Sequence, residues 1–363
     1  MLNYRKPWLD IVRAVAIIFV VLCHSVEAFY HPVLLGQRTV SFALWNGENF
    51  LFTLGRIGVP LFFATTGALL LPRKYTNASH FYKKSLLPLL LTTEIWIFFY
   101  YFFNCFINHK TIQFSQLIME MLFFKAASLS HMWYMPVILG FYIVLPFVAQ
   151  LLYSTPNIRQ YSLLYFLGIF FFFVIPTINV FLTEAFTSIP KLNIQIDTGF
   201  WGSCFSFYII SGYLISEHQL LKRIKTHVLL SGIIISFIFN SIGQYFLYAH
   251  HYYKSTWLYW YTDFPIFLIG VFTFEFLRRI YTDKNALKHG VFIEYISRCS
   301  FGVYVIHKPI LMILQKILNH IPSFFVLDQI LLLFIFGFFG SLIILYPFKH
   351  IWKKAGSVLF HIK

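Results

Sequence analysis

Apolar runs of about twenty residues recur along the whole chain, and polar residues gather between them. A helix rises 1.5 Å per residue, so such a run crosses the ~30 Å hydrocarbon core of a bilayer. Barrel strands would instead alternate apolar and polar residues, which these runs do not. The pattern predicts an all-α bundle of about ten membrane-spanning helices, over residues 8–30, 50–72, 85–107, 132–153, 161–183, 200–217, 228–249, 257–277, 291–317 and 326–348.

Two further features complete the predicted layout. Residues 114–127 mix polar and apolar positions, which favours an additional helix lying along the membrane surface. No Gly/Ser-rich linker, low-complexity tail or tandem repeat interrupts the chain. We therefore expect a single domain that covers residues 1–363.

Composition and charge exclude other classes of protein. Of the 363 residues, 59% are hydrophobic and 11% charged, whereas soluble domains carry about 25% charged residues. The net charge of +15 lies in short clusters between apolar runs, which is typical of membrane topology signals and not of nucleic-acid binding. The four cysteines share no short spacing, so they predict neither a metal site nor disulfides.

The loops differ strongly in positive charge. With ten spans, alternate loops hold 18 and 6 of the 28 Lys and Arg residues, and the other four lie inside or at the edges of spans. The positive-inside rule therefore places both termini in the cytoplasm. The richer set is Arg5, Lys6, Arg73, Lys74, Lys83, Lys84, Arg159, Lys222, Arg223, Lys225, Arg278, Arg279, Lys284, Lys288, Lys349, Lys353, Lys354 and Lys363.

The first span carries a stripe of ionisable residues. Arg13 and His24 are eleven residues apart, so they share one helix face with an axial offset of about 16 Å. Asp10 and Glu27 fall within about 40° of the same stripe. Ionisable groups within a bilayer are costly and usually mark a site. Taken singly, Arg13 also fits a snorkelling anchor, His24 an interhelical hydrogen bond, and Glu27 a solvated helix end.

Later spans place more polar residues toward the outer face, at a depth similar to that of His24. Trp133 and Tyr134 also fit an ordinary aromatic belt at the membrane interface. Together with Arg13 and Asp10 nearer the cytoplasm, the set predicts a polar cavity with two mouths, suited to either catalysis or transport. The outer residues are Arg56, His131, Trp133, Tyr134, Asp263, Tyr304 and His307.

The chain resembles the acyltransferase-3 family, and most closely its surface-polysaccharide O-acyltransferase branch. Arg13 and His24 look like the family's Arg-x10-His pattern, with Asp10 ahead of it. Three later segments match further family motifs in order, although the basic Lys83-Lys84 pair before the third span is poorer in Arg than usual. These segments are Gly58–Gly67, His131–Tyr134 with Pro146, and Ser300–His307.

The resemblance implies a bacterial, multi-pass plasma-membrane enzyme. Such an enzyme moves an acetyl or other short acyl group from cytoplasmic acyl-CoA to a hydroxyl of a surface polysaccharide or its lipid-linked precursor. The implied partners are the acyl-CoA donor, the glycan acceptor and the lipid bilayer, without a bound cofactor. A transporter or flippase for a glycan or small solute is the alternative from another class.

The resemblance also assigns roles to single residues. His24 is expected to act as general base on the sugar hydroxyl, with Glu27 orienting its imidazole. Arg56 or His307 would stabilise the oxyanion, and Arg13 would contact CoA phosphates. A covalent acyl-His24 intermediate is the mechanistic alternative. The remaining candidates for substrate binding are Asp10, His131, Trp133, Tyr134, Asp263 and Tyr304, with Trp133 and Tyr134 stacking on the acceptor sugar.

Overall fold

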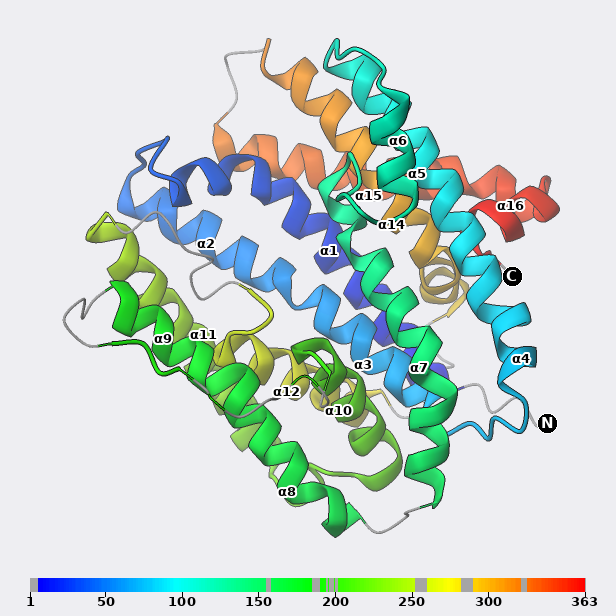
Figure 1. The fold of residues 1–363 in the computed structure, drawn as a ribbon. Helices are drawn as coiled ribbons and strands as arrows, with labels where there is room; N and C mark the ends of the chain where they lie inside the picture. Colours follow the sequence, from blue (N-terminus) through cyan, green and yellow to red (C-terminus); the bar gives the residue numbers. More distant parts are fainter. Residues whose placement is uncertain are drawn as a thin grey trace.

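The described part of the chain is a helical bundle without strands (Figure 1). The computed structural model describes residues 6–154, 158–184, 190–193, 195, 199, 202–251, 260–281, 290–320 and 325–362. The all-α class predicted from the sequence is confirmed. The α-helices are α1 Pro7–Leu34, α2 Phe42–Arg56, α3 Gly58–Leu70, α4 Ala78–Phe81, α5 Leu87–Ile107, α6 Phe114–Met121, α7 Tyr134–Ser154, α8 Ile158–Ile169, α9 Ile175–Glu184, α10 Cys204–His218, α11 Thr226–Ala249, α12 Phe264–Ile280, α14 Gly290–Leu318, α15 Val326–His350 and α16 Lys353–Phe360.

Short helical segments of other types extend three of these helices. The π-helical turns η1 (Tyr82–Leu86) and η3 (Phe170–Val174) join α4 to α5 and α8 to α9, and the 3-10 turn η2 (Ser130–Trp133) leads into α7. Eight combined segments within the described residues are long and apolar enough to cross a membrane. They are Pro7–Leu34, Phe42–Leu70, Ala78–Ile107, Ser130–Ser154, Ser162–Leu182, Thr226–Ala249, Gly290–Leu318 and Val326–His350.

The other two predicted spans are shorter than expected. Helices α10 and α12 have 15 and 17 residues, or about 22 and 26 Å at 1.5 Å per residue, less than the hydrocarbon core. Helix α10 begins after Ser203 and α12 after Asp263, whereas the predicted spans begin at residues 200 and 257. The predicted span residues 200–201 and 257–259 lie outside the described part of the chain.

The second predicted span is broken next to its polar residue. Helix α2 ends at Arg56, and α3 begins at Gly58. Pro60 lacks the N–H that would bond the Arg56 carbonyl in a continuous helix, so a break is expected here. The interruption lies beside Arg56, which belongs to the candidate site.

Helix α1 is the centre of the bundle (Figure 1). It packs against α2, α3, α12, α14 and α15, and residues such as Leu9, Ile17 and Val21 are fully buried. The outer helices instead expose large apolar side chains, including Phe98 on α5, Ile235 on α11 and Ile343 on α15. Such an apolar exterior is the face that a membrane protein turns to lipid.

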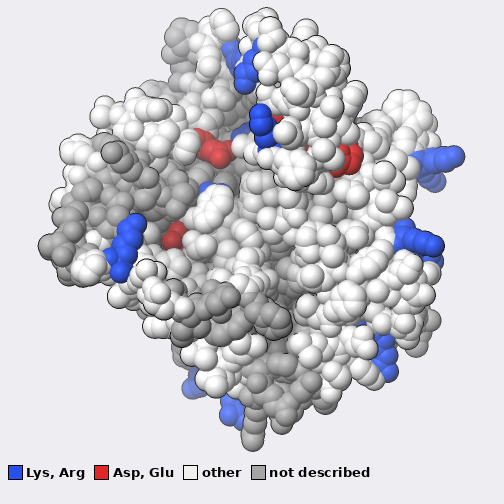
Figure 2. All heavy atoms as spheres, viewed as in Figure 1, with Lys and Arg blue, Asp and Glu red and all other residues white. Residues whose placement is uncertain are grey.

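Charged side chains avoid most of the visible surface (Figure 2). Lys and Arg residues lie along the right and lower margins and, with a few acidic residues, in the upper and left parts of this face, and α16 lies on the right in Figure 1. This distribution agrees with basic loops outside an apolar belt. Five of the cations counted in the predicted loops lie outside the described residues, and the side chain of Arg159 is not described either. The five are Arg5, Lys254, Lys284, Lys288 and Lys363.

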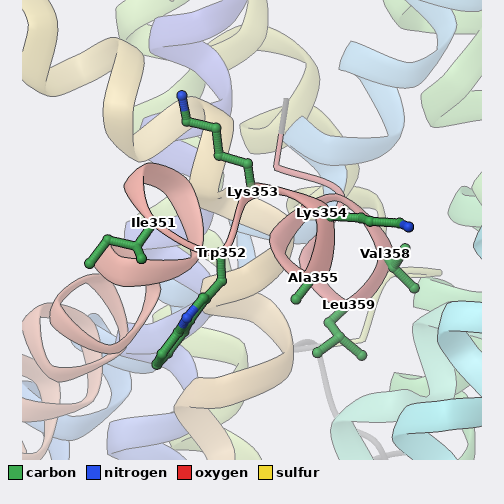
Figure 3. A pocket seen from close by; sticks show the side chains of 7 residues that line it. All are labelled: Ile351, Trp352, Lys353, Lys354, Ala355, Val358 and Leu359. Carbon is green, nitrogen blue, oxygen red and sulfur yellow. The ribbon is translucent and has the colours of Figure 1, made fainter.

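Two short helices flank α5. Helix α6 covers Phe114–Met121, the first half of the predicted surface helix, and packs against α5. Helix α16 was not predicted. It borders a surface groove lined by Ile351, Trp352, Lys353, Lys354, Ala355, Val358 and Leu359 (Figure 3). Trp96 of α5 holds the end of α16, because its indole N–H donates to the Leu359 carbonyl at 2.8 Å.

Candidate active site

The first span presents an imidazole and a carboxylate on one face. His24 and Glu27 are three residues apart on α1, and His24 Nδ1 lies 2.8 Å from Glu27 Oε2. An ionised carboxylate oxygen can only accept, so Nδ1 carries the proton, and Nε2 of a neutral imidazole then has the free lone pair. The contact is the one that Glu27 would make if it orients His24, and that role stays a prediction.

Three histidines from different helices meet at this level. The ring centre of His24 lies 5.3 Å from that of His307 on α14 and 6.2 Å from that of His131 in η2. His131 and His307 are 5.4 Å apart. Among the described residues, both ring nitrogens of His131 and the Nε2 of His307 lack a hydrogen-bond partner, although both side chains are buried. Buried polar atoms are normally paired, so these nitrogens are open to a ligand.

Hydrogen bonds to backbone carbonyl groups hold the segments that carry the two buried histidines. His307 Nδ1 donates to the Val303 carbonyl at 2.9 Å, one turn earlier on α14. The Tyr304 hydroxyl donates to the backbone carbonyl of His131 at 2.7 Å, which joins α14 to η2. Because Pro309 has no N–H, the Val305 carbonyl loses its helical partner, and the hydroxyl of Tyr100 on α5 donates to it instead.

Arg56 is buried at the break between α2 and α3. Its guanidinium donates to the Tyr261 hydroxyl at 3.2 Å. It also lies about 5 Å from the ring centres of Phe52, Trp260 and Tyr261, close enough for cation–π attraction. Gly55 permits this placement, because a Cβ there would lie 2.6 Å from the backbone of Cys23 on α1. Arg56 is therefore held against the His24 turn of the first helix.

The aromatic candidates form the wall beside Arg56. Trp133 stacks on Tyr261 at 5.4 Å and also contacts Trp260 and Phe205. Tyr134 packs against Tyr304 at 5.7 Å.

Asp263 has a different place from the one expected. Its carboxylate accepts the Trp260 backbone N–H at 2.7 Å, so it shapes the turn that carries Trp260 and Tyr261 and does not line the cavity.

The side chains enclose one small cavity. Its volume of about 20 Å³ is room for about one water molecule. Substrate access therefore requires side chains or helices to move. The cavity is lined by Val20, Cys23, His24, Gly55, Arg56, Val59, His131, Trp133, Tyr134, Tyr261 and Tyr304.

The second polar level on α1 lies apart from this cavity. Arg13 pairs with Asp10 one turn away, and Ser297 of α14 donates to the same Asp10 carboxylate at 2.9 Å. The cavity lining on α1 begins at Val20 and includes neither Asp10 nor Arg13. A passage that joins the two levels stays a prediction.

Sequence analysis missed three residues of the site. Lys308 was only counted among the four cations inside or at the edges of spans, but its Nζ lies 2.8 Å from Glu27 Oε2 and 3.5 Å from His24 Nδ1. Tyr261 and Trp260 were overlooked in favour of Asp263. The available signal for Lys308 was its place in a span next to His307. Within the described residues, no group of three His, Cys, Asp or Glu side chains has a metal-binding arrangement.

Fold and site together define an integral membrane helical protein with a buried site rich in histidine. A family model described as an acyltransferase domain matches residues 6–348. The chain therefore belongs to the acyltransferase-3 family and is a membrane acyltransferase. Comparisons with curated proteins and with solved structures found no match.

Proposed function

We propose that this protein transfers an acetyl or other short acyl group from cytoplasmic acyl-CoA to a hydroxyl of a surface glycan or its lipid-linked precursor. The observation that carries the proposal is the His24–Glu27 pair at a buried cavity, with Nδ1 of His24 bound to Glu27 at 2.8 Å. A sugar hydroxyl becomes a good nucleophile only when a base takes its proton. An imidazole with a free Nε2 lone pair is suited to that step.

The surrounding groups support the rest of the reaction. Attack on the thioester carbonyl places negative charge on its oxygen, which needs a donor or cation already in place. Arg56 lines the same cavity and is held by aromatic rings and a phenol. In this scheme Arg56 receives the developing charge, and His131 and His307 offer further ring nitrogens for the acceptor or the oxyanion. The C–S bond then breaks, and the CoA thiolate takes the proton that His24 removed from the hydroxyl.

The donor and acceptor sides of the proposal have different support. Lys and Arg side chains are spaced along the right and lower margins of the molecule (Figure 2), and cations there would suit the phosphates of CoA. Trp133 and Tyr134 border the cavity and offer aromatic surface for a sugar ring. Family membership favours acyl transfer over the transport function that the buried polar residues would also suit.

The test is the substitution His24→Ala in cells that make the surface glycan. We expect acylation of the glycan, measured by mass spectrometry at matched protein level, to fall by about 10²-fold or more. His31→Ala is the matched control, because His31 lies on the same helix but is exposed. Glycan acylation that persists in His24→Ala rules out the general-base assignment. A labelled acyl group trapped on His24 would replace direct transfer by the covalent route.

A further inference from the structure

Lys308 is an ionisable residue that the proposed reaction does not yet use. It lies on α14, one residue after the buried His307, and its side chain reaches across to α1. Its side chain is only 17% exposed. A lysine inside an apolar bundle is costly unless it is paired, so its partners indicate why it is there.

The partners of Lys308 are the two residues proposed for proton transfer. Glu27 Oε2 lies 2.8 Å from Lys308 Nζ and 2.8 Å from His24 Nδ1. One carboxylate oxygen thus accepts from an ammonium and an imidazole at once. The Lys308–His24 distance is longer, 3.5 Å. Lys308 therefore acts on His24 through Glu27.

The charge balance explains what the ammonium does. A half-buried carboxylate facing an imidazole alone is best compensated by a second proton on the imidazole, which would leave both ring nitrogens protonated. Such an imidazolium cannot take a proton from a hydroxyl. With Lys308 present, the carboxylate is already neutralised, and it needs only the Nδ1–H of a neutral imidazole.

We propose that Lys308 is a positioning residue that neutralises Glu27 and so keeps His24 a neutral base with its free lone pair on Nε2. This inference rests on the proposed function, because it assumes that His24 accepts the proton of the acceptor hydroxyl. It adds a residue from α14 to a base that sequence analysis assigned to α1 alone.

The experiment measures acetyl transfer by the purified full-length protein. Acetyl-CoA labelled in the acetyl group is the donor, and n-octyl β-glucoside serves as the sugar acceptor, with release of acetate to water counted as well. Lys308→Met should lower kcat roughly 10–100-fold, within the 10²–10⁴-fold that a general base contributes. The KM for acetyl-CoA should change little, because Lys308 lies outside the cavity lining. Lys308→Arg should restore most of the rate.

A double-mutant cycle separates this role from a merely structural one. Glu27→Gln removes the carboxylate that Lys308 neutralises, so adding Lys308→Met to it should cost little further activity. Lys316→Met is the matched control, since Lys316 lies on the same helix and bonds the Ile107 carbonyl away from the site. Its rate should stay within about twofold of the unmodified protein, as expected for a change that leaves the base untouched.

The outcomes separate the two proposals. If Lys308→Met keeps the full rate, if its effect adds independently to that of Glu27→Gln, or if the lost rate only follows lost folded protein, the positioning role is wrong. If the positioning role of Lys308 fails while His24→Ala abolishes transfer in the same assay, the proposed function still stands. If the unmodified protein does not turn over acetyl-CoA, or if His24→Ala remains active, the proposed function fails and the role of Lys308 fails with it.

Discussion

Replacing Gly55 by alanine is expected to lower the rate of acyl transfer strongly while lowering the stability of the fold only modestly. A change at a charged residue would separate these two effects less clearly. A Cβ at position 55 would lie 2.6 Å from both Cα and N of Cys23. Carbon contacts are comfortable only from about 3.5 Å, so α2 must move away from α1 by roughly 0.9 Å. The atoms met are backbone atoms of a central helix, and rotation of a side chain cannot relieve the contact.

The displacement falls next to the reactive groups. Gly55 precedes Arg56, and Cys23 precedes His24, so the strain acts directly on the distance between guanidinium and imidazole. Overpacking of this kind costs about 1–3 kcal/mol, partly offset by the ~1 kcal/mol by which alanine is the better helix former. A misplacement of about 1 Å in a catalytic arrangement costs up to ~10²-fold in rate. We therefore expect a modest loss of stability and a large loss of transfer.

Gly47→Ala is the matched control on the same helix. A Cβ at Gly47 meets the Leu327 side chain at 3.6 Å, an ordinary contact. This variant should keep its activity and melt at an equal or higher temperature, because only the helix-propensity gain of up to ~1 kcal/mol remains. Thermal melting in detergent and the acetyl-transfer assay together test the pair. If Gly55→Ala behaves like Gly47→Ala in both measurements, the close α1–α2 approach does not position Arg56.

Two further predictions concern stability. Trp96→Phe removes the N–H that holds the Leu359 carbonyl, so the protein should lose about 1 kcal/mol and α16 should be cleaved faster by carboxypeptidase; an unchanged cleavage rate would contradict this. Glu275→Gln removes a buried carboxylate that accepts three hydrogen bonds from Arg278 and Arg279, and it should cost about 1.5–3 kcal/mol in a melting experiment. Glu294→Gln, in a half-exposed pair with Arg298, should cost less than about 1 kcal/mol, and equal losses would refute the role of burial.

Most of the residues that sequence analysis placed at one depth do lie together, with Asp263 as the exception. Spans, orientation and helical rise suffice to bring His24, Arg56, His131 and His307 to one level, because depth in a membrane follows from position along each span. The partner of His24 followed as well, since residues three apart on a helix are neighbours. The roles of these residues in catalysis stay predictions.

Other features depended on how the helices are rotated against each other, which periodicity does not determine. Lys308 resembles an interfacial anchor in sequence, and only the approach of α14 to α1 pairs it with Glu27. Asp263 appeared to be a cavity residue, but its carboxylate is used by the turn before α12. The lengths of α10 and α12 were overestimated because the apolar runs extend beyond the first helical residues, Cys204 and Phe264.

The pairing of α1 with α14 connects the two polar levels of the first span. At one level Ser297 of α14 bonds Asp10 at 2.9 Å, and at the other Lys308 bonds Glu27 at 2.8 Å. Ser297 and Lys308 are eleven residues apart, the same spacing as Arg13 and His24, so they too share a face with an offset of about 16 Å. Their partners Asp10 and Glu27 are seventeen residues apart, an offset of about 26 Å, so the long Lys308 side chain spans the difference. Helix α14 therefore contacts the ionisable stripe of α1 at two levels, and the position of the His24 base depends on that helix as well as on its own.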